Sequence, residues 1–169
     1  MTRPQSDEYG SWFSRYVDRV PDGDIITMLG QQGAETEALL ARAGDGTHRY
    51  AEGKWSVKQV VGHLTDAERV FAYRLMAIAR GEQQSLPGFD ENPYVDNAGF
   101  DEQSLSDLAE ALAVQRRATL LLIRQLSDEA WSRRGVANGN PISVRALAWV
   151  TAGHERHHVA ILRERYGLT

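Results

Sequence analysis

Five consecutive residues near the end of the chain, His154-Glu155-Arg156-His157-His158, have side chains suited to metal chemistry. His154 and His158 are four positions apart, so on a helix their imidazoles lie on one face, about one turn from each other. Two imidazoles placed in this way can bind one metal ion from the same side. The five residues also match H-E-x-x-H, the pattern with which zinc peptidases bind their metal.

His63 offers a third imidazole that is predicted to point into the protein. It lies three positions after Val60 and four before Ala67, both on the apolar face of a predicted helix. His158 falls near the middle of the apolar face of its own helix, and His154 about 40° to one side. We therefore expect the three imidazoles to share one metal ion, although each could instead bond a neighbouring carbonyl or carboxylate. Neutral imidazoles suit zinc, nickel, iron or cobalt, and three protein ligands leave a position open, as in catalytic sites.

Other polar residues are candidates for roles beside the metal or the substrate. Glu68 and Glu155 flank the inward faces of their helices, where each could accept a hydrogen bond from an imidazole N–H or could be a solvated charge. His157 lies toward the edge of the apolar face, as a supporting group or a surface residue, and His48 is predicted to be solvated in a turn. Four arginines can be interpreted as surface charges alone: Arg69, Arg74, Arg116 and Arg117. No catalytic residue is assigned.

Four stretches with the apolar period of a helix would position these residues. They cover about 23–43, Ser56 to Gly81, a segment from near Ser104, and a segment from near Ser143 to about Tyr166. Ser56, followed three residues later by Gln59, is typical of a helix start. No segment alternates convincingly with a period of two. The pattern predicts an all-α four-helix bundle in a single domain over residues 1–169.

The connection from Gly81 to Gln103 is unusually long for a compact domain. Its prolines and Gly88 predict a shaped rather than a helical segment. Asp90 offers a hydrogen-bond acceptor and Tyr94 offers apolar area. We predict that residues 87–94 lie against the open mouth of the bundle, where they help to bind substrate or screen the metal from water. The alternative is that the segment only crosses the bundle to join distant helix ends.

The overall composition restricts the classes of function. Apolar residues make up 42 % of the chain and charged residues 25 %, as in ordinary globular proteins, and the net charge of −4 gives no basic footprint for nucleic acid. The absence of cysteine excludes disulfides, thiolate metal sites and a cysteine nucleophile. The first residues, MTRPQSDEYG, lack the apolar region of a signal peptide, and no apolar run is long enough to span a bilayer. We therefore expect a cytoplasmic protein without membrane or nucleic-acid partners.

The match to the zinc-peptidase pattern is interpreted as a coincidence. The third ligand of such enzymes normally lies downstream of the motif. Here Glu164 is the remaining downstream carboxylate, six positions after His158 on the same helix, and it faces elsewhere. Ile161 and Glu164 occupy the places of the extended motif, and no strand is expected that could hold a peptide in extended form.

With these residues in place, the chain resembles the DinB-like (YfiT-type) superfamily of four-helix-bundle metalloproteins, which is unrelated to the DNA polymerase that shares the DinB name. The resemblance covers most of the chain from about Tyr50 onward, and the first stretch is only loosely similar. It rests on Gly53-Lys54-Trp55-Ser56-Val57, Val61-Gly62-His63-Leu64, residues 68–74, residues 86–91 and the final histidine motif.

The resemblance implies an up-down-down-up bundle, usually a homodimer, and its metal ligands carry over onto His63, His154 and His158. Biochemically defined members are metal-dependent transferases that move low-molecular-weight thiols, such as bacillithiol, onto electrophiles. A related branch is the mycothiol-dependent maleylpyruvate isomerase, and many members are labelled metal-dependent hydrolases.

Three functions for a small-molecule substrate therefore stay open. The first is a thiol S-transferase in which the metal binds a thiol co-substrate as thiolate. The second is a hydrolase with metal-bound water as nucleophile. The third is a metal-binding stress protein without turnover.

Overall fold

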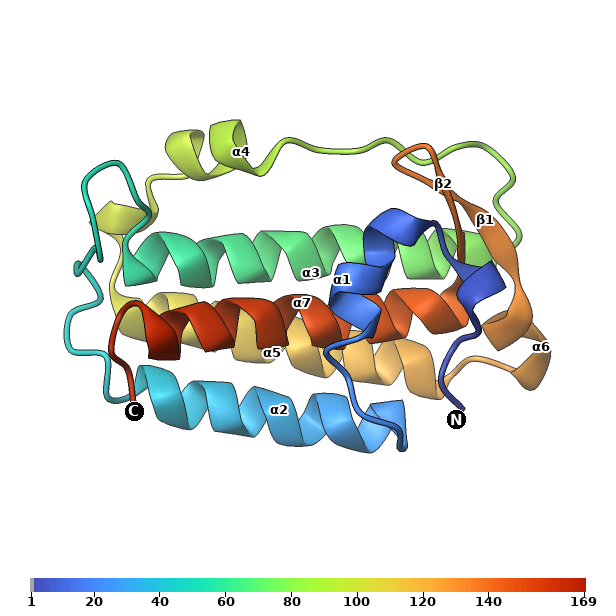
Figure 1. Ribbon diagram of the computed structural model, residues 1–169, viewed down its shortest axis with the longest axis horizontal. Helices are drawn as coiled ribbons and strands as arrows, with labels where there is room; N and C mark the ends of the chain where they lie inside the picture. The colour runs from blue at the N-terminus through green and yellow to red at the C-terminus, as the bar shows by residue number, and fades with distance from the viewer. Residues whose placement is uncertain (1) are drawn as a thin grey trace.

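The computed structural model, which describes residues 2–169, has four long helices packed side by side as a bundle (Figure 1). They are α2 (Ile25–Leu40), α3 (Val57–Ala79), α5 (Leu105–Arg124) and α7 (Val144–Glu164). Figure 1 shows α3 and α5 running in one direction and α2 and α7 in the opposite direction. The predicted all-α four-helix bundle is confirmed.

Each long helix begins where a short polar side chain caps it. Asp24, Ser56, Ser104 and Ser143 each accept a hydrogen bond from a backbone N–H in the first turn. At Ser56 the bond is reciprocal, because the Gln59 side chain also accepts from the Ser56 N–H. These caps lie at or within one residue of the predicted helix starts, since capping depends on neighbours in the sequence alone.

The core consists of two apolar clusters with buried polar residues between them. On α3, one cluster contains Val57 to Leu64 and the other begins at Ala67. On α7, one cluster ends at Ala152 and the other resumes at Leu162. The three candidate metal-binding histidines, together with Glu68, Arg116 and Glu155, fall at this junction. A bundle interior that is apolar at both ends therefore contains a polar layer in its middle.

Short elements complete the fold beside and beyond the four long helices. They are η1 (Ser6–Glu8), η2 (Ser11–Phe13), α1 (Ser14–Val17) and α6 (Asp128–Ser132). Helix α1 packs against α7 next to Gly153, and any β-carbon at that position would collide with the backbone of Tyr16. Glycine thus permits the close approach that brings Tyr16 beside His154.

A β-hairpin precedes α7, and the prediction that the chain has no strand is wrong. Strands β1 (Arg134–Ala137) and β2 (Asn140–Ser143) pair antiparallel, with Arg134 opposite Ser143. Asn138 and Gly139 both have positive φ angles, 52° and 70°, which a two-residue hairpin turn requires. Strands of four residues are too short to show a clear alternation. Bridges from Leu86 to Ala137 and from Tyr9 to Ile142 also occupy the outer edges of the hairpin.

The long connection contains α4 (Glu91–Asn97) and η3 (Phe100–Glu102), so the prediction of a non-helical segment is wrong for this part. Asp90 caps α4 by accepting a hydrogen bond from the Asn92 N–H. Pro93 lies in the first turn of α4, where a helix does not need the missing N–H. Because α3 and α5 run in the same direction, the connection must return along the whole bundle, as Figure 1 shows.

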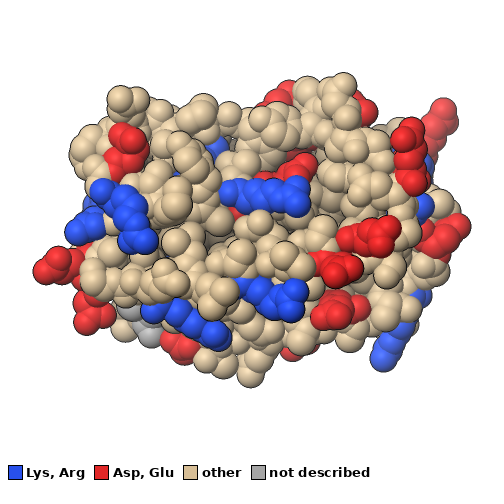
Figure 2. All heavy atoms as spheres, turned by 180° about the vertical axis from the view of Figure 1, so that it is seen from behind, with Lys and Arg blue, Asp and Glu red and all other residues tan. Residues whose placement is uncertain are grey.

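The described helices include none that is long and apolar enough to cross a membrane. Figure 2 shows acidic and basic side chains scattered among uncharged atoms on the face opposite to the view of Figure 1. That face therefore carries no continuous field of one sign.

Candidate metal centre

Helices α3 and α7 bring three imidazoles together in the polar layer. His63 comes from α3, and His154 and His158 come from successive turns of α7. One ring nitrogen from each lies within 4.8 Å of the others, and the Nε2 atoms of His63 and His154 are 3.1 Å apart. His63 and His154 are buried and His158 is half-buried. The structure thus unites the three histidines that the sequence selects.

Burial keeps these imidazoles in their neutral form. It lowers the pKa of His63 to about 4, with a smaller opposing effect from Asp66. Burial also lowers the pKa of His154 and His158 well below the ordinary histidine value, and the neighbouring imidazoles add to this effect. Neutral imidazole is the form that donates a lone pair to a metal ion, so at neutral pH no proton has to be removed first.

The spacing of the ring nitrogens fits a shared metal ion. Zinc–nitrogen bonds of about 2.0–2.1 Å at angles of roughly 90–110° separate two ligand nitrogens by roughly 2.9–3.4 Å. The 3.1 Å between the Nε2 atoms of His63 and His154 lies in that interval. The same distance fits an N–H···N hydrogen bond when one ring carries its proton on Nε2, and it fits a cation held by both lone pairs when neither ring does. The donor set therefore suits a divalent transition metal.

A cavity of about 390 Å³ opens beside the three histidines. Its walls are rich in aromatic rings, which include those of Trp12, Tyr16, Trp55, Phe71 and Phe89. The Trp55 ring lies 4.9 Å from that of His63, and the Phe71 ring lies 5.3 Å from that of His154, measured between centroids. These contacts fix the imidazole orientations and leave room for a small organic molecule next to them.

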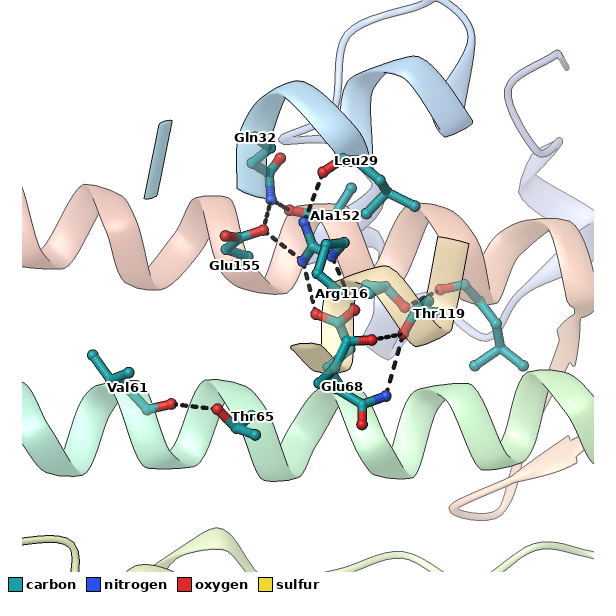
Figure 3. A network of polar contacts seen from close by, with 12 residues as sticks. Leu29, Gln32, Val61, Thr65, Glu68, Arg116, Thr119, Ala152 and Glu155 are labelled. Atoms are coloured by element: carbon teal, nitrogen blue, oxygen red, sulfur yellow. Dashed lines mark hydrogen bonds and ion pairs between the residues drawn. The ribbon is translucent and has the colours of Figure 1, made fainter. Parts of the chain in front are cut away.

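Glu68 and Glu155 lie in a different part of the polar layer, where they bind Arg116 (Figure 3). Arg116 donates to both carboxylate oxygens of Glu68, at 2.9 and 2.7 Å, and to Glu155 at 2.7 Å. Gln32 also donates to Glu155, and Arg116 donates to the Leu29 carbonyl at 2.9 Å. Within residues 2–169, no hydrogen bond joins either carboxylate to an imidazole. The network instead connects all four long helices.

Two interpretations of charged residues are corrected by this network and its surroundings. Glu68 and Glu155 are not solvated, since each is 3 % exposed. Arg116 and Arg74 are not surface charges, since each is 4 % exposed. Helical periodicity indicated the inward lean of both glutamates, but it could not show that an arginine on a third helix would reach them.

The remaining candidates are placed as follows. His157 is half-buried and lines the cavity, with its ring 5.0 Å from that of His158. Asp90 and Tyr94 are exposed and are not among the lining residues, whereas their neighbours Phe89 and Glu91 are. His48 is exposed, as predicted.

Sequence reasoning missed Arg74 as a lining residue of this cavity. Its spacing carried a usable signal, because eleven residues after His63 correspond to three helical turns and return to the same face. Tyr16, Trp55 and Phe89 come from three separate segments and had no comparable signal. Their positions depend on how those segments pack over α3 and α7.

The profile of the DinB superfamily matches residues 28–162, which is most of the chain. The chain belongs to the DinB superfamily. A relative from Oceanobacillus iheyensis, named putative metal-dependent hydrolase OB0413, is 26 % identical over 115 residues, which are 68 % of this chain. The matched region spans 66 % of that relative's length, just under two thirds.

Solved structures support the same fold. One similar structure is YfiT from Bacillus subtilis, which is described as a probable metal-dependent hydrolase with an unusual four-helix bundle topology. The two structures align with a TM-score of 0.75 and 21 % sequence identity, over 86 % of this chain and 87 % of the YfiT chain. The mycothiol-dependent maleylpyruvate isomerase is similar with a TM-score of 0.65 and 17 % identity, over 80 % of this chain and 58 % of its own. At these identities the likeness concerns the fold alone.

Proposed function

We propose that this DinB-superfamily protein is a metal-dependent S-transferase that moves a low-molecular-weight thiol onto a small electrophile. His63, His154 and His158 would hold one divalent transition metal ion. The observation that carries the proposal is the convergence of three neutral imidazoles, two of them buried and one half-buried, on the wall of a cavity that also contains several aromatic rings. Three protein ligands leave room for an exogenous ligand, as in catalytic metal sites.

The fixed glutamates favour thiol transfer over hydrolysis. Attack by water generally requires a base to accept a proton, and the glutamate of the H-E-x-x-H pattern takes this role in peptidases. Here the Glu155 carboxylate is bound by Arg116 and Gln32, so it does not face the cavity as a free base. A bound metal ion would lower the pKa of a thiol so that thiolate is available near neutral pH.

The residues of the chain would bind and shield the reactants. The rings of Trp55, Phe71 and Phe89 provide the apolar part of a wall that also carries polar and charged side chains, so an electrophile could pack its apolar surface against them. In the reaction, R–SH and R′–X give R–S–R′ and HX, so that one S–C bond forms as one C–X bond breaks. The protein has no cysteine, hence the thiol is a co-substrate rather than a side chain.

A metal-dependent hydrolase is the second candidate. The names of the Oceanobacillus relative and of YfiT favour it, and Glu91 offers an exposed carboxylate on the cavity wall. A metal-binding protein without turnover is the remaining possibility.

We also propose that the chain forms a single domain, that two copies associate and that the protein acts in the cytoplasm. The dimer is supported by the resemblance to the DinB-like superfamily, whose members are usually homodimers. The cytoplasmic location is supported by the proposed co-substrate, a low-molecular-weight thiol. Light scattering would then give twice the 18.9 kDa mass of one chain. A monomer at micromolar protein concentration would contradict the proposed dimer but not the proposed domain or location.

Thiol consumption tests the proposal directly. Protein purified without an affinity tag is analysed for metal and incubated with 1-chloro-2,4-dinitrobenzene and a panel of thiols that includes bacillithiol and mycothiol. We expect metal-dependent loss of free thiol, which a chelator abolishes and added metal restores. The absence of cysteine means that the protein itself gives no background in a thiol assay.

Ester hydrolysis is measured in parallel with p-nitrophenyl acetate and no thiol. Metal-dependent product release that needs no thiol would establish the hydrolase instead. Bound metal with neither reaction would support the protein without turnover. His63→Ala is the inactive control, and His48→Ala, which changes an exposed histidine, is the matched control that should retain activity.

A further inference from the structure

Arg74 is a buried charge in the wall of the cavity that the proposed reaction does not yet use. Its side chain comes from α3, three turns beyond His63, and the residue is 4 % exposed. One guanidinium nitrogen donates to the Pro87 carbonyl at 2.6 Å. Within residues 2–169, no carboxylate lies close enough to form an ion pair with it, although Glu91 lines the same cavity. Burial lowers the pKa of Arg74, and no neighbouring charge opposes this effect.

A buried guanidinium without a counter-ion is energetically costly, because its charge has been removed from water without an ion pair. A single carbonyl satisfies one of its five N–H donors. The other donors lie next to the cavity rather than against a fixed acid. Arginine presents these donors as a rigid planar fork, which matches the two oxygens of a carboxylate.

The rest of the cavity indicates the chemistry of the missing counter-ion. Phe71, Phe89 and Trp55 line it with apolar rings, and the volume of about 390 Å³ accommodates a small organic molecule. The exposed Arg15 and Glu91 place one charge of each sign on its wall, so the buried Arg74 gives the lining its excess of positive charge. A ligand with an apolar body and one acidic group would place its body against the rings and its charge against Arg74.

We propose that Arg74 binds the carboxylate of a small, largely apolar organic acid, which is the electrophile held beside the three histidines. This inference rests on the proposed function for the role of the ligand as substrate. The binding of the acid, however, depends on Arg74 and can be measured without turnover.

Benzoate and benzamide are suitable probes because they share shape and apolar area but differ in charge. Their binding is measured by isothermal titration calorimetry with zinc-loaded protein. We expect benzoate to bind about tenfold more tightly than benzamide, as a charge-assisted hydrogen-bond pair implies. In Arg74→Gln this preference should disappear, while the affinity for benzamide stays unchanged.

Arg69→Gln is the matched control, because Arg69 is an exposed arginine on the same helix, paired with Asp66. It should bind both probes like the parent protein. Arg74→Lys is a second variant that retains the buried charge if Arg74→Gln fails to fold. The lysine lacks the planar fork, so we expect it to reduce the preference for benzoate by about threefold to tenfold.

Metal content, measured on the same samples, separates this inference from the proposed function. Parent protein that binds no metal contradicts the proposed function, and the preference for benzoate then tests Arg74 in the metal-free protein. If both Arg74 variants still prefer benzoate to benzamide, the carboxylate binds to the metal or to another group, and the inference is overturned. Equal binding of benzoate and benzamide by the parent protein would overturn it as well.

Discussion

Arg116 and Arg74 are two equally buried arginines in opposite surroundings. Arg116 meets two carboxylates and a carbonyl from three other helices, and Arg74 meets one carbonyl. Burial opposes the charge in both cases. At Arg116 the fields of Glu155 and Glu68 and their hydrogen bonds outweigh burial and raise the pKa above its usual value, whereas at Arg74 burial alone acts and lowers it.

The difference separates a structural polar network from the proposed binding site in the same layer of the bundle. Around Arg116 the chain itself supplies the opposite charges, so the network is satisfied when the helices pack. Around Arg74 and the three histidines, positive charge and imidazole nitrogens line a cavity, and we propose that their partners come from solution. Incomplete pairing inside a folded protein therefore indicates where a ligand binds.

The largest expected effect is the loss of metal from the three histidines, which lie on the cavity side of the polar layer. His63→Ala or His158→Ala removes one of three ligands and should weaken metal binding by about 100-fold or more. Metal content by mass spectrometry measures this change, and His48→Ala is expected to bind metal like the parent. Equal metal content in His63→Ala and the parent would refute the three-histidine site.

The next effect concerns stability, and it contrasts the two arginines directly. Arg116→Met leaves Glu68 and Glu155 buried without a cation and should lower the free energy of unfolding by about 3–5 kcal/mol. Arg74→Met leaves no carboxylate unpaired and should change it by about 1 kcal/mol or less. Urea unfolding of metal-free proteins measures both values. Similar losses in the two variants would contradict the distinction.

A smaller effect is expected for Glu155→Gln. The substitution removes the charge that faces Arg116 but keeps Glu68 as its partner, so the free energy of unfolding should fall by about 1–3 kcal/mol. Metal content should be retained. We also expect the parent protein not to cleave casein. Metal-dependent cleavage of casein that Glu155→Gln abolishes would restore the peptidase interpretation.

The smallest effect is expected in the long connection. Tyr94→Phe removes a hydroxyl from an exposed residue outside the cavity lining and should change the KM for substrate by less than about twofold. Phe89→Ala removes a ring from the cavity wall and should raise the KM by several-fold, by analogy with other buried aromatic contacts. A larger effect of Tyr94→Phe than of Phe89→Ala would place the substrate over α4 instead.

Local sequence signals predicted the parts of this protein that depend on neighbours in the chain. Ser56, Ser104 and Ser143 cap helices through bonds to residues three positions later, and the spacing of His154 and His158 gives one helix face. The β-hairpin was missed because four-residue strands have too little periodicity. Its Asn138-Gly139 turn was the available signal.

The sequence by itself determined that four amphipathic helices form and that three histidines point inward, because helical periodicity fixes the face of each residue. Tertiary structure alone decided which charges meet. Arg116 lies 48 residues from Glu68 and 39 from Glu155, and their pairing depends on how α3, α5 and α7 pack. The same packing gives Arg74 a cavity instead of a carboxylate, since the field at a buried side chain comes from elements distant in the sequence.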